Sequence, residues 1–200
     1  MLPNSLTVAW CLSVLAVSVG SSAAESPRSS SQNIVTAGIP NTANVSVQMA
    51  PDQSVSVGAK ISFRVTTRKP GYLLLVDIDP SGKMSQIFPS PEMVVQLREA
   101  ATNFIKPGEE LVIPNTAAQK RGFEYVITPP TGDAAVVAIL SDRRVQLLDL
   151  PDSVERPLSG AEAAGYLAEW IGALRVPDAD TGRLQSGHWS FDVKPYSIRP

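Results

Sequence analysis

Apolar and polar residues follow one another in short stretches from residue 44 to residue 141, as they do along β-strands. In residues 61–66 the apolar side chains occupy every second position, so one face of the expected strand is buried. Residues 72–78 and 134–140 are almost continuously apolar, which is typical of strands covered on both faces. Turn residues separate the stretches at intervals of roughly 8–12 residues, which favours a sandwich or a barrel.

About eight strands are expected in all, including a terminal strand in which Trp189, Phe191 and Val193 share one face. The expected strands lie at residues 44–49, 61–66, 72–78, 84–88, 109–113, 123–128, 134–140 and 187–193. The predicted fold class is therefore all-β, and the predicted architecture is a β-sandwich of the immunoglobulin-like or jelly-roll-like kind.

One α-helix is expected over residues 159–175, inserted before the last strand. Ser159 and Glu162 have the spacing of a capping box at its start. Trp170 lies one position off the apolar stripe, so it either packs the helix against the sandwich, which we favour, or marks a partner surface. The residues of the stripe recur at helical spacing and are Ala164, Leu167, Ala168, Ile171 and Leu174.

The first 24 residues contain no charged side chain, and residues 6–19 form an almost unbroken apolar run. The run is shorter than the roughly 20 residues that a membrane span needs, and Ser22 and Ala24 fit a cleavage site. We therefore expect a signal peptide at residues 1–24, a flexible linker at residues 25–44 and a β-rich domain at residues 45–200. Because residues 1–5 contain no Lys or Arg, an uncleaved anchor is the alternative.

Cysteine usage and charge limit the partners that we expect. Cys11 is the only cysteine and lies within the expected signal peptide, so the mature chain would have no disulfides. The net charge of −2 gives no reason to expect nucleic acid as a partner. We also expect no membrane association after cleavage of the signal peptide.

The sharpest local motif lies at residues 77–82, where Asp77, Asp79 and Ser81 match the opening of a calcium-binding loop. The last position of such a loop needs a bidentate glutamate, and this chain has Phe88 there. We therefore interpret the motif as a hairpin turn. A weak cation site with Asp77, Asp79 and Ser81 as the metal ligands is the alternative.

No catalytic residues are expected. His188 is the only histidine, and along one extended strand Asp192 lies roughly 13 Å from it. This distance excludes a triad of His188, Ser190 and Asp192 within the strand, whereas a partner for His188 from elsewhere in the chain is left open. No glycine-rich phosphate loop leads from a strand into a helix. We therefore expect a protein that is not an enzyme and that has no cofactor-binding residues.

The stretch from residue 54 to residue 144 resembles the bacterial family known as domain of unknown function 4384. The resemblance implies a β-rich accessory domain, found alone or attached to caspase-like and kinase-like domains, and it implies no known reaction. It rests on the order of eight short signatures: Val57-Gly58, Pro70-Gly71-Tyr72-Leu73, Asp79-Pro80-Ser81-Gly82-Lys83, Ile87-Phe88-Pro89, Lys106-Pro107-Gly108-Glu109, Val112-Ile113-Pro114, Pro129-Pro130-Thr131-Gly132 and residues 138–142.

These observations together lead us to expect an exported accessory domain, located in the periplasm or secreted by a bacterium. Its role would be to contact an unidentified protein partner in the cell envelope. The alternative is a domain that binds a small ligand or a cation such as calcium through the loop from Asp77 to Gly82.

Overall fold

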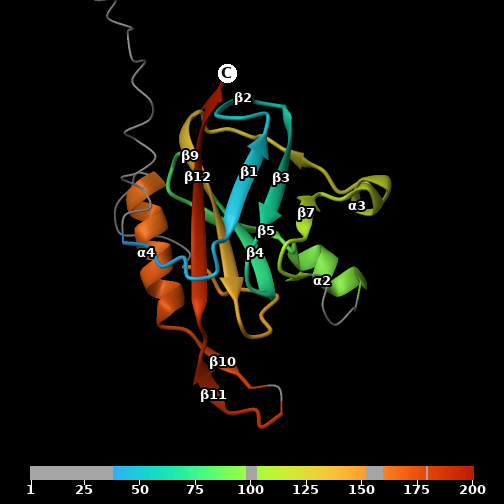
Figure 1. Ribbon diagram of the computed structural model, residues 1–200. Coiled ribbons are helices and arrows are strands. Elements are labelled where there is room, and N and C mark those ends of the chain that lie inside the picture. Colours follow the sequence, from blue (N-terminus) through green and yellow to red (C-terminus); the bar gives the residue numbers. More distant parts are fainter. Residues whose placement is uncertain (1–37, 98–102, 152–159, 179) are drawn as a thin grey trace, which may run out of the picture.

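The computed structural model describes residues 38–97, 103–151, 160–178 and 180–200. The expected signal peptide, most of the expected linker and the expected helix cap Ser159 lie outside these described residues. The described chain forms two packed β-sheets with a long helix, α4 (Gly160–Gly172), on the outer face of the larger sheet (Figure 1). This arrangement confirms the predicted all-β sandwich-like fold.

The smaller sheet has the strand order β1-β3-β7, and a short strand, β8, pairs with β3 next to β7 along the same side. All of its pairs are antiparallel. Its strands are β1 (Ser46–Ala50), β3 (Lys60–Thr66), β7 (Glu110–Ile113) and β8 (Tyr125–Val126).

The larger sheet has the order β2-β12-β9-β4-β5, and β6 pairs with β4 off this path. The pair of β2 with β12 is parallel, and the other pairs are antiparallel. Its strands are β2 (Ser54–Ser56), β4 (Gly71–Ile78), β5 (Met84–Phe88), β6 (Phe104–Ile105), β9 (Gly132–Ser141) and β12 (Trp189–Arg199).

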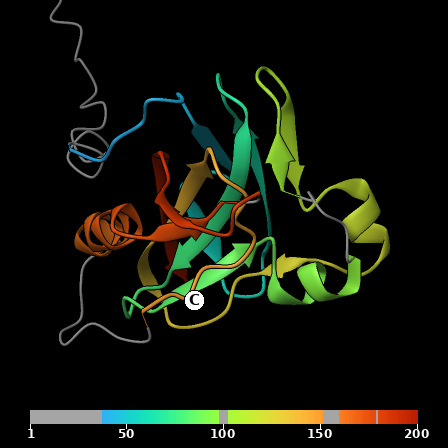
Figure 2. The same cartoon turned by 90° about the horizontal axis from the view of Figure 1, so that it is seen from below.

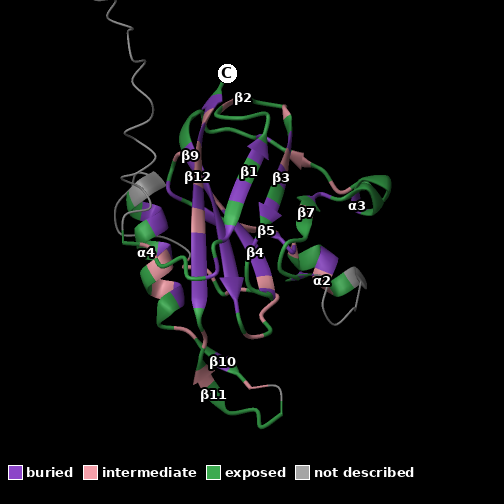
Figure 3. Ribbon diagram, in the orientation of Figure 1, coloured by how far each residue is buried: buried purple, intermediate pink, exposed green. Residues whose placement is uncertain are grey.

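Alternate residues of β4 supply two separate cores. Leu73 and Leu75 face the smaller sheet and pack in the core that contains Phe63, whereas Leu74 and Val76 face the other way and pack with Leu167 of α4. All six side chains are fully buried. The molecule therefore has three layers, and the nearly continuous apolar pattern of β4 and β9 follows from their burial on both faces (Figures 2 and 3).

All eight predicted strands are present, together with four short strands and two helices that we did not expect. α3 begins where Asn115 Oδ1 accepts a hydrogen bond from the backbone N–H of Ala118 at 2.8 Å, a helix-capping contact. Each unexpected element has seven residues or fewer, so it is too short to show a clear period of apolar residues. These elements are β2, β6, β10 (Arg175–Pro177), β11 (Leu184–Ser186), α2 (Pro91–Leu97) and α3 (Thr116–Lys120).

The boundaries of the last helix and the last strand differ from the prediction. α4 ends at Gly172 rather than at residue 175, and the chain then enters the hairpin of β10 and β11. β12 continues past residue 193 to Arg199, although Pro195 lies within it. Proline is tolerated there because β2 pairs only with residues 197–199, so among the described strands β9 alone pairs with β12 at Pro195.

Residues 38–44 pack on the domain, although we expected them to belong to the linker. Ala43 is buried, Ile39 packs against the core under α4, and the carbonyl of Pro40 accepts a hydrogen bond from the N–H of Phe191 at 2.9 Å. Ile39, Pro40 and Ala43 therefore pack with the folded domain, ahead of the start that we expected at residue 45.

Side chains cover the outer edge of the chain from Ala43 to Val47, where β1 begins. Their oxygens accept hydrogen bonds from three backbone N–H groups that have no neighbouring strand: Ala43 N binds Ser190 Oγ at 3.0 Å, Val45 N binds Asn41 Oδ1 at 2.8 Å, and Val47 N binds Asp192 Oδ2 at 2.7 Å. Two of the three acceptors come from β12, so this edge of the smaller sheet is joined to the larger sheet. An edge closed in this way does not offer these donors to another chain.

In the part of the chain that the structure describes, no helix combines the length and the apolar character needed to cross a membrane.

Candidate ligand-binding cavity

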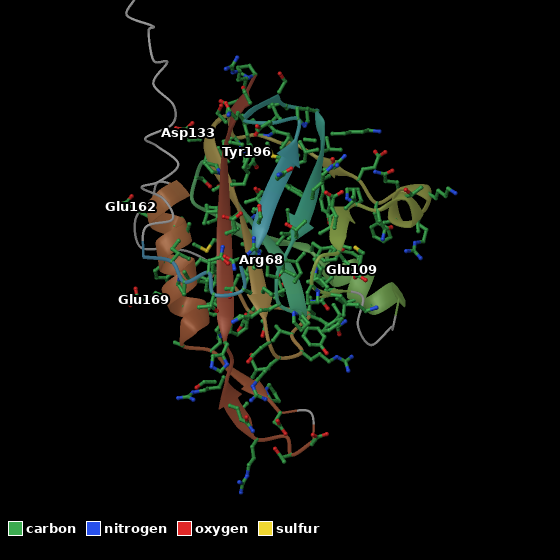
Figure 4. All side chains as sticks on the ribbon, in the orientation of Figure 1. Arg68, Glu109, Asp133, Glu162, Glu169 and Tyr196 are labelled. Carbon is green, nitrogen blue, oxygen red and sulfur yellow. The ribbon has the colours of Figure 1, made fainter. Side chains whose placement is uncertain are left out.

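A cavity of about 400 Å³ lies between the two sheets, where β4 ends and β5 begins. Its walls come from both sheets and include the apolar side chains of Ile61, Ile87, Ile127 and Ile198. Its titratable side chains are Asp77, Asp79, Lys83, Glu124, Tyr125 and Tyr196. The labelled Tyr196 marks this end of the sandwich in Figure 4.

Asp77 faces the space between the sheets because it shares a face of β4 with Leu73 and Leu75. The hydroxyl of Tyr196, which is buried in β12, donates a hydrogen bond of 2.8 Å to Asp77 Oδ1. Among the described residues, Tyr196 is the only hydrogen-bond partner of the Asp77 carboxylate, and no cation lies within ion-pair distance of it. The cavity therefore contains a largely buried acid without a counter-ion.

Burial raises the pKa of Asp77 to about 6, because the charged form loses contact with water. The hydrogen bond from Tyr196 lowers this pKa in part, and the nearby negative charge of Asp79 raises it further. Burial, followed by the charge of Asp77, raises the pKa of Tyr196, so the tyrosine stays protonated and donates the hydrogen bond. Asp77 is therefore mostly ionised at neutral pH and mostly protonated below pH 6.

This titration is expected to affect stability in a defined direction. The folded protein holds the Asp77 proton more tightly than the unfolded chain, in which an aspartate has a pKa of about 3.9. The free energy of unfolding should therefore fall as the pH rises from about 4 to about 6, by up to about 3 kcal/mol, and then stay level. Asp77→Asn, which keeps an acceptor for Tyr196, should remove this fall.

Urea unfolding of the protein and of Asp77→Asn between pH 4 and pH 7 measures the effect. The difference between the two curves isolates Asp77 from other groups, such as Asp192, whose pKa burial also raises. Parallel pH profiles for the two proteins would contradict the assignment.

The loop that follows Asp77 is a hydrogen-bonded turn. Asp79 Oδ1 accepts three hydrogen bonds, from the N–H and the hydroxyl of Ser81 at 2.8 and 2.6 Å and from the N–H of Lys83 at 3.0 Å. Gly82 supports the turn with a φ of 84°, and Phe88 is buried in the core between the sheets. Asp77 and Asp79 both line the cavity, but Ser81 does not. Within the described ranges, no three His, Cys, Asp or Glu side chains are grouped so that they could hold a metal ion.

Two residues on the opposite wall have partners of their own. The hydroxyl of Tyr125 donates to the carbonyl of Ile87 at 2.5 Å, and burial raises the pKa of this tyrosine to about 12. Glu124 forms an exposed ion pair with Lys60 at 2.8 Å. Neither side chain neutralises Asp77, and Tyr125 joins the smaller sheet to β5 across the cavity.

His188 and Ser190 line one cavity of about 270 Å³ together with Asp142, whereas Asp192 does not line it. His188 is exposed, and its Nδ1 lies 2.7 Å from Asp142 Oδ2, whereas Ser190 and Asp192 accept hydrogen bonds from backbone N–H groups near β1. Asp142 was not identified from the sequence. The pairing of β9 with β12 could have indicated it, because Ser141 lies opposite Trp189 and the next pair along is Asp142 and His188.

Trp170 is half-buried and packs against the core under α4, which agrees with the packing role.

Sequence reasoning also missed Tyr196, the partner of Asp77. The predicted strand ended at residue 193, three residues before Tyr196. A signal was present, since Tyr196 and Ile198 continue the alternation of Ser190 and Asp192 on the face toward the smaller sheet.

The fold and this cavity define the class of protein: a β-sandwich domain with an acidic, ligand-sized cavity between its sheets. Residues 54–144 match the family model described as Domain of unknown function (DUF4384), and this part of the chain is a DUF4384 domain. The match confirms the resemblance found in the sequence. Comparisons with curated proteins and with solved structures give no match.

The family match and the folded domain do not have the same limits. The match begins at β2 and ends just after β9, whereas β1, α4 and β12 lie outside it. Most of the cavity belongs to the matched segment, and β12 adds Tyr196 and Ile198. Three of the family signatures meet near the cavity: residues 79–83 supply part of its wall, Pro129 lines it, and Ile87 accepts the bond from Tyr125.

Proposed function

We propose that this protein is an exported, non-enzymatic binding domain and that the cavity between its sheets binds a small organic ligand. The observation that carries the proposal is the cavity of about 400 Å³ with a largely buried, unneutralised carboxylate inside apolar walls. Binding sites are typically concave and mostly apolar, with a few polar groups that orient the ligand. A titratable group with a displaced pKa in such a place is a further indication of a site.

The other parts of the proposal rest on the sequence. The uncharged, apolar first 24 residues support export to the periplasm or beyond. Ser190 and Asp192 accept hydrogen bonds from backbone N–H groups near β1, and this structural use supports a role in binding rather than in catalysis. Contact with a protein partner in the cell envelope stays a prediction from the sequence.

Filling the cavity tests the proposal. Ser85 lines the cavity and is exposed, so Ser85→Trp should occupy the space without disturbing either core. Ser56→Trp, at an exposed serine of β2 outside the cavity lining, is the matched control. Backbone amide chemical shifts would be followed by NMR during titration with hexan-1-ol, hexanoate, hexylammonium and calcium chloride.

We expect at least one of the three organic probes to cause saturable shifts around the cavity in the protein and in Ser56→Trp. In Ser85→Trp these shifts should be absent. If no organic probe shifts these amides, or if Ser85→Trp binds as the parent does, the cavity is not a binding site. Shifts caused by calcium alone would favour the cation site that the sequence left open.

A further inference from the structure

None of the residues that the structure describes supplies a counter-ion for the charge of Asp77. Buried charges in proteins are normally paired, because an isolated one loses its hydration without compensation. Tyr196 donates to Oδ1 of Asp77, and none of the described residues donates to Oδ2. The one lysine of the lining, Lys83, makes no ion pair with Asp77. The carboxylate therefore has an open acceptor position on the side of the cavity.

The cavity lining as a whole also has an excess of negative charge. Three carboxylates, those of Asp77, Asp79 and Glu124, stand against the single ammonium group of Lys83. Glu124 is neutralised by Lys60, which leaves the negative charge concentrated at Asp77 and Asp79. The negative charge of Asp79 raises the pKa of Asp77, so the two charges interact. A negative end of the cavity attracts a cationic group and repels an anionic one.

The rest of the cavity suits an organic cation better than a metal ion. Calcium needs six to eight oxygen ligands, and Asp79 already uses Oδ1 in the turn. The volume of about 400 Å³ is much larger than a single ion requires. The isoleucines of both sheets give the remaining wall an apolar surface that matches a hydrocarbon group.

We infer that the ligand of this cavity is a small organic amine, whose ammonium group binds the carboxylate of Asp77 and whose apolar part lies against the isoleucine side chains. This inference rests on the proposed function and names the class of its ligand. An ammonium group has three N–H donors, so it can bind Asp77 Oδ2 and still reach the neighbouring Asp79. Tyr196 then keeps its bond to Oδ1 and holds the carboxylate in position.

Two probes of matched shape, hexylammonium and hexan-1-ol, separate charge from apolar packing. NMR titration of the protein at pH 7.5 should give a Kd for hexylammonium at least about ten times lower than that for hexan-1-ol, a difference of about 1.4 kcal/mol. In Asp77→Asn this preference should disappear, while hexan-1-ol should bind as before. Glu110→Gln, whose exposed carboxylate pairs with Arg64 and does not line the cavity, should keep the preference within about twofold.

A second readout is the pH dependence. Lowering the pH from 7.5 to 5 should weaken hexylammonium binding about tenfold, because Asp77 becomes protonated, and should leave hexan-1-ol unaffected. The other titratable groups that face Asp77 are Asp79 and Lys83 in the turn, Glu124 and Tyr125 on the opposite wall, and Tyr196 in β12. The Asp77→Asn variant separates their contribution, since it should bind hexylammonium equally at both pH values.

Equal affinity for the two probes, or a preference that persists in Asp77→Asn, would overturn the inference while the proposed function stands. If neither probe binds in the cavity and hexanoate fails as well, both would be overturned. A well-dispersed NMR spectrum of Asp77→Asn, which we expect from its predicted stability, shows that loss of binding is not loss of folding.

Discussion

Replacing Phe63 with alanine is expected to lower the free energy of unfolding by about 3–5 kcal/mol. Phe63 is fully buried at the middle of β3, opposite Met49 of β1 and Ile113 of β7. Its ring also meets the ring of Tyr125 edge-on, with 6.0 Å between centroids. Alanine would leave a void between two sheets whose backbones cannot move together far enough to fill it.

Urea unfolding followed by tryptophan fluorescence measures this loss. The neighbouring Arg64→Ala is the matched control, because its exposed side chain forms only a surface ion pair with Glu110 and should cost less than about 1 kcal/mol. Domains of this kind have a total stability of about 5–15 kcal/mol, so the Phe63 variant should be close to unfolding. A cost below 1 kcal/mol would mean that the core between the sheets is not packed as described.

Replacing Leu167 with alanine is expected to cost about 2–5 kcal/mol, although the residue lies outside the matched segment. Its side chain is fully buried between α4 and the larger sheet, together with Ile171 and Ala164. The helix packs directly on β4, β9 and β12, so its loss would expose the outer face of the central strands. We therefore expect one cooperative transition, shifted as a whole to lower urea.

Glu169→Ala is the control for this experiment, since Glu169 is exposed on the same helix and points away from the sheets (Figure 4). It should change the stability by less than about 0.5 kcal/mol. A Leu167→Ala variant that loses helical circular dichroism while the sheets unfold at the original urea concentration would show that α4 folds separately.

The sequence was informative about the fold where burial imposes a pattern. The continuous apolar run of β4 correctly indicated a strand covered on both faces, since Leu74 and Leu75 enter different cores. The apolar stripe of α4 allowed the helix to be predicted for the same reason, although the predicted C-terminal end of the helix lay beyond the observed one. Short strands such as β6 and β10 were missed because two or three residues display no period, and they form through pairing with distant partners.

Only part of the candidate site could be predicted from the sequence. The sequence identified Asp77 and Asp79, but as candidate metal ligands. Spacing alone does not show which side chains accept hydrogen bonds from the turn residues. The role of Asp77 depends on Tyr196, which is distant along the chain and becomes a neighbour only through the pairing of β12 with β9 and of β9 with β4. The cavity depends on the spacing between two sheets, and local pattern carries no information about that distance.

The position of β12 has a consequence for how this domain can be divided. β9 pairs with β12 along its whole length and is buried on both faces over most of it. A chain cut at the end of the family match would turn this central strand into a long, flat, hydrophobic edge, the kind of surface that recruits other chains into aggregates. The family match thus marks a segment of similar sequence, whereas the unit that folds without exposing β9 has to include the C-terminal strand.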